Sequence, residues 1–420
     1  MPVSRTAYGA AHFGKSLLWH CSALFFAFYL TEVAGFSPKA MGALLAGSLI
    51  LNALFDLGIG ARLGRWVRTL ESAAKAQALG ALVACTTFLA FASLFLWPQD
   101  IRAVIAVVSL IAFRIGYSCL DVPQNTILAF ISRDDVGRTQ AASVRYMAAG
   151  ASLLIVTLSL APWLTSVAPV KRAEAFFLFA LCLTPVTLAT AGFLWWRLRH
   201  HSTEAPVPTA VPNTADGQSL HRADLYLALG SILIYSGLVP LFTKLEAYFV
   251  AYAPRDQGLE YFMVAAALGQ VIGQLAWMQV ARQVQLLTLY RIAALCLMMS
   301  TLAFMVIAPT GGLGALVVAS LFGVSSSGLL TAIWSFLARS AAASPASATL
   351  KFGLLTFCSK MAQAGSAVAL GFVLSQIDYR RAEDFKTLIQ TMASGPLLTA
   401  ALCLALTVLY SKLRRKALAT

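Results

Sequence analysis

Long apolar stretches of about 20 residues recur along almost the whole chain, separated by short polar segments. A helix of that length crosses the hydrocarbon core of a bilayer. Only 11% of the residues are charged and 59% are hydrophobic, whereas about a quarter of the residues in a soluble domain are charged. The sequence therefore predicts an all-α membrane protein. We expect twelve transmembrane helices, with centres near residues 22, 48, 86, 113, 153, 185, 236, 269, 298, 324, 363 and 399.

One connection is much longer and more polar than the others. The stretch 200–222 is rich in Pro, Ser and Thr and has no helical periodicity, so we predict a flexible linker there. It divides the chain into an N-terminal six-helix bundle (1–199) and a C-terminal six-helix bundle (223–420). This two-bundle layout resembles the major facilitator superfamily, in which the halves rock around a central site at mid-membrane.

The distribution of Lys and Arg predicts the orientation of the chain. With the N-terminus in the cytoplasm, about 18 of the 31 Lys and Arg residues fall on the cytoplasmic side and about 8 on the opposite side. This bias places both termini and the linker in the cytoplasm, as an even number of spans requires. Because the loops are compact, we expect a multi-pass protein of a bacterial inner (plasma) membrane.

Several function classes fit the sequence poorly. The net charge of +14 lies in short clusters between apolar segments, without the aromatic-interleaved basic face of a nucleic-acid-binding protein. The seven cysteines lie inside apolar segments at no metal-ligand spacing, and the five histidines form no cluster with acidic residues. We therefore expect no nucleic-acid partner, no metal site, no catalytic residue and no enzymatic activity. A channel would more often be a shorter, oligomeric chain, whereas this chain is expected to be a monomer.

The strongest functional signal is a set of ionisable residues inside the apolar stretches. A charge in the hydrocarbon region is costly unless it faces a water-filled cavity or a partner, so each such residue is a site candidate. Two alternatives stay open, because a lysine near a helix end can reach the membrane surface and an ion pair can be purely structural. The set comprises Lys15, Asp56, Arg114, Asp121, Arg145, Lys244, Glu246 and Lys360.

Asp121 is the sharpest member of this set. In the segment RIGYSCLDVPQN it follows Tyr117 and Ser118. Pro123 is predicted to interrupt the helix just after Asp121, and such a break is tolerated where a helix lines a cavity. Arg145 is expected to pair with Asp121 or to hold an anionic group of a solute, because an arginine cannot lose its charge to relieve burial.

Two further helices carry polar candidates. Asn52 precedes Asp56 by four residues, so both side chains share one helical face and together suit binding of a proton or small cation. In the C-terminal half, Lys360 lies among small residues with Gln363 nearby. Trp334 is either an aromatic platform for a ring or a tryptophan at the lipid interface.

Gly269 and Gly273 lie on one face of a predicted helix in the C-terminal half. Small residues at such spacing more often permit close helix packing than contact with a ligand. We therefore expect a helix–helix contact there.

Several segments carry family-like motifs. These segments are the opening segment YGAAHFGKSLLWHCSALFFAFYLTEVAGFSPKAMGALL and the later segments LNALFDLGIGARLGR, YSCLDVPQNTIL, GRTQAASVRYMAAGAS and LLTFCSKMAQAGSA. They resemble, in order, the first two helices, the second-helix acidic motif, the fourth-helix Asp–Pro motif, the fifth-helix Arg and the eleventh-helix Lys of one transporter family. That family is the glycoside–pentoside–hexuronide:cation symporters, the melibiose permease family of the major facilitator superfamily.

The resemblance implies two groups of site residues. It places solute-binding residues at Lys15, Asp121, Arg145, Trp334 and Lys360, with Tyr117 and Asn125 beside them. It places cation or proton coupling at Asp56, Asn52 and Ser118, where Asn52 stands in place of a second Asp and Ser118 stands in for a hydroxyl ligand. We add Asp121 as a coupling residue linked to Asp56.

The chain also departs from the family pattern. Phe55 replaces a polar cation ligand, Ser16 replaces an Asp that follows the Lys, and Asn125 replaces a sugar-stacking Trp. Na⁺ is a hard cation that needs several oxygen ligands, so a site with one carboxylate favours a proton. A pocket with three cationic residues and fewer acids favours an anionic or zwitterionic solute over a neutral disaccharide.

Together these features predict a secondary active transporter. We expect a proton-coupled symporter that imports a small polar, anionic or sugar-derived solute by alternating access, with H⁺ rather than Na⁺ as coupling ion and no cofactor. Its expected partners are the solute, the coupling cation and the lipid bilayer. Two alternatives remain: an exporter or carrier of an amphiphilic solute (a siderophore, lipid or drug-like compound) on the same fold, and a non-transporting membrane receptor.

Overall fold

The computed structural model describes residues 2–66, 69–131, 135–165, 168–200, 215–253, 258–342, 348–381 and 384–419. Within them the chain forms twelve α-helices, and every predicted span centre falls inside one of them. The first six are α1 (Pro2–Glu32), α2 (Pro38–Trp66), α3 (Leu70–Ala92), α4 (Gln99–Ile131), α5 (Asp135–Leu164) and α6 (Pro169–Leu198). The last six are α7 (Ala215–Tyr252), α8 (Phe262–Val280), α9 (Leu286–Ile307), α10 (Gly312–Ala342), α11 (Ala348–Leu374) and α12 (Phe385–Ala419). The predicted all-α class with twelve helices is confirmed.

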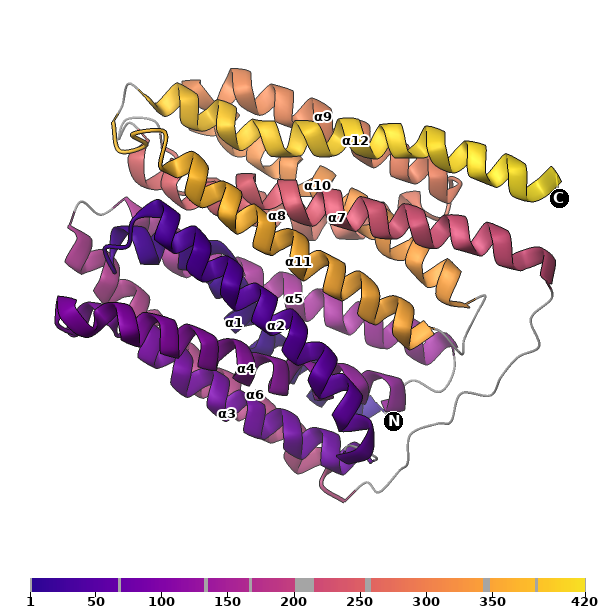
Figure 1. The fold of residues 1–420 in the computed structure, drawn as a ribbon, viewed down its shortest axis with the longest axis horizontal. Coiled ribbons are helices and arrows are strands. Elements are labelled where there is room, and N and C mark those ends of the chain that lie inside the picture. Colours follow the sequence, from indigo (N-terminus) through magenta and orange to yellow (C-terminus); the bar gives the residue numbers. More distant parts are fainter. Residues whose placement is uncertain are drawn as a thin grey trace. The chain divides into compact units, whose positions relative to one another are not determined.

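The helices form two compact units, Met1–Val207 and Pro208–Thr420, with six helices each (Figure 1). Residues 201–214 of the predicted linker lie outside the described residues. The end of that stretch differs from the prediction, because α7 begins at Ala215 and not at 223. Its first turns (ADGQSLHR) are polar, which hides them from a search for apolar periodicity although most of these residues tolerate a helix.

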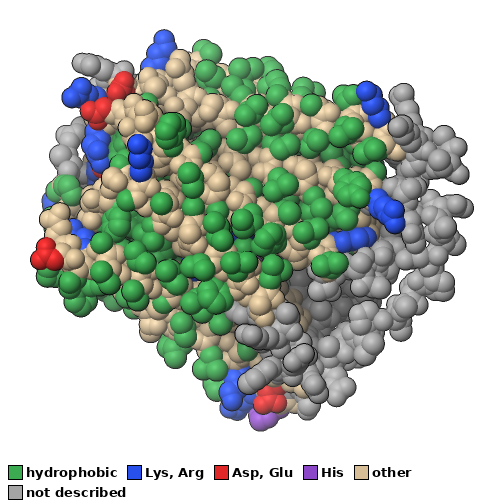
Figure 2. Space-filling view, in the orientation of Figure 1, with side chains coloured by type: hydrophobic (Ala, Val, Ile, Leu, Met, Phe, Trp, Pro, Cys, Tyr) green, Lys and Arg blue, Asp and Glu red, His purple; other side chains and the backbone are tan. Residues whose placement is uncertain are grey.

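Eleven of the twelve helices are long and apolar enough to cross a membrane. The helix outside this group is α1, which is long enough but carries Lys15 and His20 within its span. Large apolar side chains cover the outside of the helices, with Leu313 77% exposed and Val306 74% exposed. On the face seen in Figure 2, apolar side chains spread over the middle of the helices and most charged side chains lie toward their ends. This surface is the one that a bilayer requires.

The packing of unit 1 brings three helices together around α4. Both α1 and α2 contact α4, while α3 packs along α4 on another side. Phe26 of α1 stacks on Phe91 of α3, with 4.3 Å between ring centroids, and contacts Phe113 of α4. The hydroxyl of Tyr29 donates a hydrogen bond of 2.6 Å to the carbonyl of Ala92. This aromatic core fixes α1 against α3 and α4.

The α4 helix continues through Pro123, so the predicted interruption at this residue is wrong. Proline has no N–H to donate to the carbonyl of Cys119, four residues earlier. Gly80 of α3 lies directly against that carbonyl, so closely that an added Cβ would clash with Cys119 and Leu120. The neighbouring helix α3 therefore packs closely on α4 at the point where this backbone hydrogen bond is missing.

In unit 2, glycines let α8 and α10 approach each other closely. Gly269 lies against the backbone of Ser320, and Gly273 lies against Val324. Trp277 of α8 donates a hydrogen bond of 2.7 Å from Nε1 to the carbonyl of Val324. The predicted helix–helix contact at Gly269 and Gly273 is therefore confirmed.

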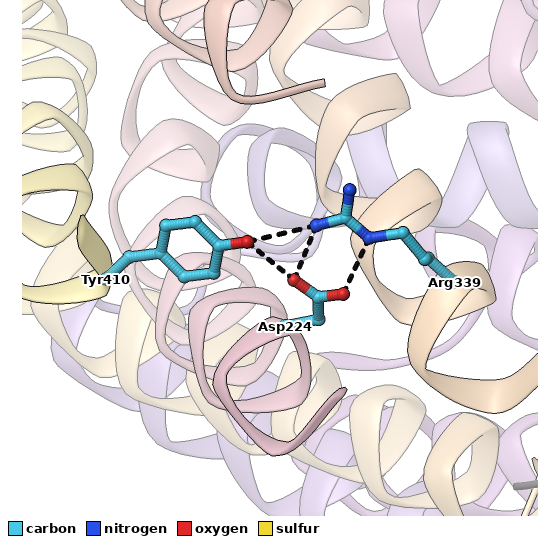
Figure 3. Close-up of polar contacts among 3 residues, drawn as sticks. All are labelled: Asp224, Arg339 and Tyr410. Atoms are coloured by element: carbon cyan, nitrogen blue, oxygen red, sulfur yellow. Dashed lines mark hydrogen bonds and ion pairs between the residues drawn. The ribbon is translucent and has the colours of Figure 1, made fainter. Parts of the chain in front are cut away.

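A polar cluster joins three helices near one end of unit 2 (Figure 3). Arg339 of α10 binds both carboxylate oxygens of Asp224 on α7, at 2.6 Å each. Tyr410 of α12 donates to Asp224 Oδ1 at 2.8 Å and accepts from Arg339 at 3.0 Å. Asp224 is nearly buried, with a side chain that is 4% exposed. A bidentate pair closed by a tyrosine holds α7, α10 and α12 in one arrangement.

Candidate functional site

Two predicted site residues of unit 1 form an ion pair between α1 and α4. Lys15 Nζ lies 2.6 Å from Asp121 Oδ1, and it also donates to Asn125 Oδ1 at 3.3 Å. The Lys15 side chain is 3% exposed and that of Asp121 is 18% exposed. Lys15 therefore points into the bundle and does not reach toward the membrane surface. The pair leaves one carboxylate partly accessible beside a buried ammonium group.

A second polar group lies between α2 and α4. Asn52 Nδ2 donates to Ser118 Oγ at 2.7 Å and to the carbonyl of Arg114 at 3.1 Å. Asn52 and Ser118 are both fully buried. Asp56 follows one turn later on α2 and lies within electrostatic range of Tyr117 and Cys119 of α4. The structure therefore brings Asn52, Asp56 and Ser118, three of the four predicted coupling residues, into one region.

Tyr117 lies between these two groups. It is 4% exposed, and its ring packs against Trp19 of α1 with 5.5 Å between centroids. Both Asp121 and Asp56 lie within electrostatic range of its side chain. Tyr117 is therefore near both the ion pair of α1 and α4 and the polar group of α2 and α4.

Among the described side chains Arg145 does not pair with Asp121, so only its second expected role, holding an anionic group of a solute, stays a prediction. Asp121 pairs with Lys15, and among the described side chains neither Arg145 nor Arg114 forms a salt bridge with it. Arg145 of α5 is half-buried and lies within electrostatic range of Tyr117. The buried Arg114 points toward α2, where its Nε donates to Ser48 Oγ at 3.4 Å. The helical register places Arg114 beside α2, which the spacing of seven residues from Asp121 does not reveal.

Sequence reasoning missed three buried polar residues beside the ion pair. Tyr8 and His12 lie on α1, and Gln124 lies on α4; their exposed fractions are 1%, 4% and 0%. The signal was available, because His12 precedes Lys15 by three residues and Gln124 follows Asp121 by three. Residues at that spacing lie on one helical face. They were passed over because they carry no fixed charge.

Unit 2 carries the remaining candidates. Lys360 of α11 is 5% exposed, and its neighbour Ser359 forms a 2.8 Å hydrogen bond with Ser236 of α7. Gln363 donates to Ser359 Oγ at 3.2 Å. Trp334 of α10 stacks on Phe352 of α11, with 6.2 Å between ring centroids and an angle of 21°. Lys360 thus lies beside a polar cluster, whereas the ring of Trp334 has an aromatic neighbour.

The polar residues of unit 1 include both charged and neutral hydrogen-bonding groups. Among the described residues, no group of three His, Cys, Asp or Glu side chains is placed to hold a metal ion. What unit 1 offers is a buried ammonium, an arginine, two carboxylates and several neutral hydrogen-bonding groups. Such a set can bind an anionic group and exchange a proton.

A separate apolar cavity of about 490 Å³ lies along α1, α5 and α6 of unit 1. Its lining includes Phe13, Leu17, Ile155, Trp163 and Phe179. Trp163 is 52% exposed and Ile155 is 42% exposed, so this cavity is partly open at the surface of the helices. Its chemistry suits a hydrocarbon chain.

A family model described as MFS/sugar transport protein matches residues 7–412. No curated protein matches the sequence. Among solved structures, the chain resembles a POT family transporter in complex with 5-aminolevulinic acid. The TM-score is 0.72 and the identity 12%, with 97% of this chain and 96% of that chain covered.

Two further solved structures are similar. The nucleoside transporter NupG matches with a TM-score of 0.68 and 10% identity, over 96% of this chain and 99% of that one. The peptide transporter POT in complex with sulfate matches with a TM-score of 0.66 and 14% identity, over 98% and 95%. At such identities the likeness establishes the fold, which is that of these membrane transporters.

Proposed function

Because the chain belongs to the family of MFS/sugar transport proteins, we propose that it is a proton-coupled symporter that imports a small polar solute. The family and fold are those of multi-pass membrane transporters and not of enzymes. They favour transport over a non-transporting receptor. The proposal concerns the finer points, which are the coupling ion, the solute class and the direction.

The observation that carries the proposal is the buried ion pair of Lys15 and Asp121, 2.6 Å apart. A charged pair inside a membrane bundle is costly and is weak support for stability. Charges in such positions mark solute and proton pathways. The pair lies beside Asn125 and near Tyr117, so a solute that displaces Lys15 from Asp121 would meet further polar groups.

Coupling is assigned to Asp56, with Asn52 and Ser118 beside it. Asn52 donates to Ser118 Oγ through its Nδ2, and its Oδ1 has no hydrogen-bond partner among the described residues. Na⁺ would need several free oxygens at one point, whereas a proton needs only one carboxylate. The arrangement therefore favours H⁺. Protonation of Asp56, linked to Asp121 through the region of Tyr117, would then shift the balance between outward-open and inward-open states.

The solute is proposed to carry a negative charge. Lys15 and Arg145 of unit 1 and Lys360 of unit 2 are the cationic candidates, and Asp121 neutralises one of them. A carboxylate or similar anion would compete with Asp121 for Lys15. The proposed class is therefore an anionic, sugar-derived or zwitterionic solute that is carried by alternating access.

The test is solute-induced proton uptake into proteoliposomes, with sugars, sugar acids and organic acids as probes. We expect one anionic class to drive proton uptake in the wild type without Na⁺. Asp56→Asn should abolish proton movement, because an amide cannot carry the proton.

The control is Asp100→Asn, which removes an exposed carboxylate in the first turn of α4 and should leave uptake unchanged. Uptake that requires Na⁺, or uptake indifferent to Asp56→Asn, would overturn the coupling assignment.

A second candidate function is supported by the apolar cavity of 490 Å³. An amphiphilic solute, such as a lipid or siderophore, would place its hydrocarbon part there, in either direction of transport. A fluorescent lysophospholipid in the same proteoliposomes distinguishes the two candidate functions. A carrier of amphiphilic solutes would change the distribution of this lipid across the membrane, whereas a symporter of small polar solutes would leave it unchanged.

The proposed setting is a monomer in a bacterial inner membrane, with both termini in the cytoplasm. The Lys and Arg bias of the loops supports this orientation. The bilayer, the solute and the coupling proton are then its partners, and no cofactor is needed for a mechanism based on alternating access.

A further inference from the structure

Three buried polar side chains beside the ion pair have hydrogen-bonding atoms without partners. These atoms are the hydroxyl of Tyr8, Nδ1 of His12 and both amide atoms of Gln124, considered against the described part of the chain. Each side chain is at least nine-tenths buried. Protein interiors rarely leave such groups unsatisfied, since each costs the lost hydrogen bonds with water.

The three residues form one group. The rings of Tyr8 and His12 are stacked one turn apart on α1, with 6.1 Å between centroids and an angle of 19°. His12 and Gln124 lie close together across the contact of α1 and α4, although they do not meet in hydrogen-bond geometry. Lys15 and Arg145 both lie within electrostatic range of His12. The group therefore adjoins the candidate solute site.

The chemistry of the group defines what it can bind. A phenol, an imidazole and an amide offer both donors and acceptors without a fixed charge. Their natural complement is a neutral group that both donates and accepts, which is a property of hydroxyl groups. Apolar side chains would fill the same space at lower cost, so the polar groups are explained by a ligand that satisfies them.

We propose that Tyr8, His12 and Gln124 form a neutral subsite that binds hydroxyl groups of the solute, while Lys15 and Arg145 hold its anionic group. This proposal rests on the proposed function and refines its solute class. The solute is then a polyhydroxylated anion and not a simple carboxylic acid.

The test compares two anionic probes, D-glucuronate and propionate, by calorimetric titration of the full-length protein in nanodiscs. The variants are Gln124→Leu and the milder Tyr8→Phe, which removes only a hydroxyl. Gln77→Leu is the matched control, because Gln77 is a fully buried glutamine of α3 whose amide group donates to the carbonyls of Ala74 and Ala191.

We expect Gln124→Leu to weaken D-glucuronate binding at least tenfold and Tyr8→Phe to weaken it about threefold. Propionate binding should change less than twofold in both. If the variants weaken the binding of both probes equally, or leave the binding of both unchanged, the proposed subsite is overturned. Unchanged binding would mean that the group holds only structural water.

A second measurement separates this inference from the proposed function. Without solute, Gln124→Leu should leave the unfolding temperature unchanged or raise it, whereas Gln77→Leu should lower it. A fall for Gln124→Leu equal to that for Gln77→Leu overturns the subsite. Failure of the wild type to bind either probe would overturn the anionic solute class, and the unfolding temperatures would then decide the subsite alone.

Discussion

At the scale of single residues, the charges inside unit 1 are arranged in two ways. Lys15 and Asp121 neutralise each other directly at 2.6 Å. Arg114 is buried without a carboxylate within salt-bridge distance among the described residues, and it contacts Ser48 Oγ and the ring of Phe113. The first arrangement can open and close as a solute or proton arrives. The second is tied to the contact of α2 and α4.

Breaking the ion pair from one side should destabilise the protein. Lys15→Met leaves the Asp121 carboxylate without its ammonium partner, and loss of one member of a buried pair costs about 3–5 kcal/mol. We expect a clear fall in the unfolding temperature in detergent. Asp121→Leu added to Lys15→Met should restore much of it, because both charges are then gone. The double variant should remain inactive in transport. A single variant as stable as the wild type would contradict this reading.

The sequence predicted which residue types matter in unit 1, but not which of them meet. Lys15, Asp121 and Asp56 stood out because charges are rare in apolar stretches. The pairing of Lys15 with Asp121 depends on the rotation of α1 against α4, which spacing along one helix does not define. Pairing of Asp121 with Arg145 was therefore only one of two alternatives that the sequence left open for this arginine. Neutral groups such as His12 and Gln124 gave no signal until their burial was known.

At the scale of helices, close contacts depend on residues without side-chain bulk. Gly80 allows α3 to lie on the α4 backbone, and Gly269 allows α8 to lie on the backbone of Ser320. Replacement of either glycine by a larger residue would force the two helices of that contact apart. These contacts set the helix positions, and through them the position of the candidate site.

Adding one methyl group at Gly269 should be destabilising. The new Cβ of Gly269→Ala would meet the backbone of Ser320, and overpacking of this kind costs about 1–3 kcal/mol. The control is Gly365→Ala on α11, where an added Cβ has no atom within 4 Å. That change should be neutral or slightly stabilising because alanine favours a helix. Thermal unfolding monitored by intrinsic fluorescence would compare the two, and an equal response would refute the close contact.

Helix positions were predictable to a large extent, and helix ends were not. Each predicted centre lies in a helix because 20-residue apolar stretches are a strong signal. The polar start of α7 at Ala215 lacked that signal. α4 continues through Pro123, as α5, α6, α7 and α12 continue through Pro162, Pro185, Pro240 and Pro396, so the rule that a proline ends a helix fails in these membrane-spanning segments.

At the scale of the whole molecule, the transmembrane assignment of α1 determines the topology. Eleven other helices are apolar enough to span the membrane, and α1 completes an even number. It carries Lys15, yet this charge is buried against α4. We therefore expect α1 to cross the bilayer and both chain ends to lie on one side.

Labelling with a membrane-impermeant thiol reagent tests this topology in intact cells. Ser4→Cys and Ala417→Cys, each in a cysteine-free background, should react only after permeabilisation, because the proposed topology places both termini in the cytoplasm. Lys171→Cys, at the start of α6 on the opposite predicted side, should react without permeabilisation. Labelling of Ser4→Cys in intact cells together with protection of Ala417→Cys would mean that α1 does not span.

The pairing of Lys15 with Asp121 has a consequence for biosynthesis. A nascent chain that contains only α1 presents an ammonium group to hydrocarbon before its counter-charge has been synthesised. That counter-charge arrives with α4, after two more helices have left the ribosome. We therefore expect that α1, although it is synthesised first, stays near the insertion machinery and packs into unit 1 only after α4 has been inserted.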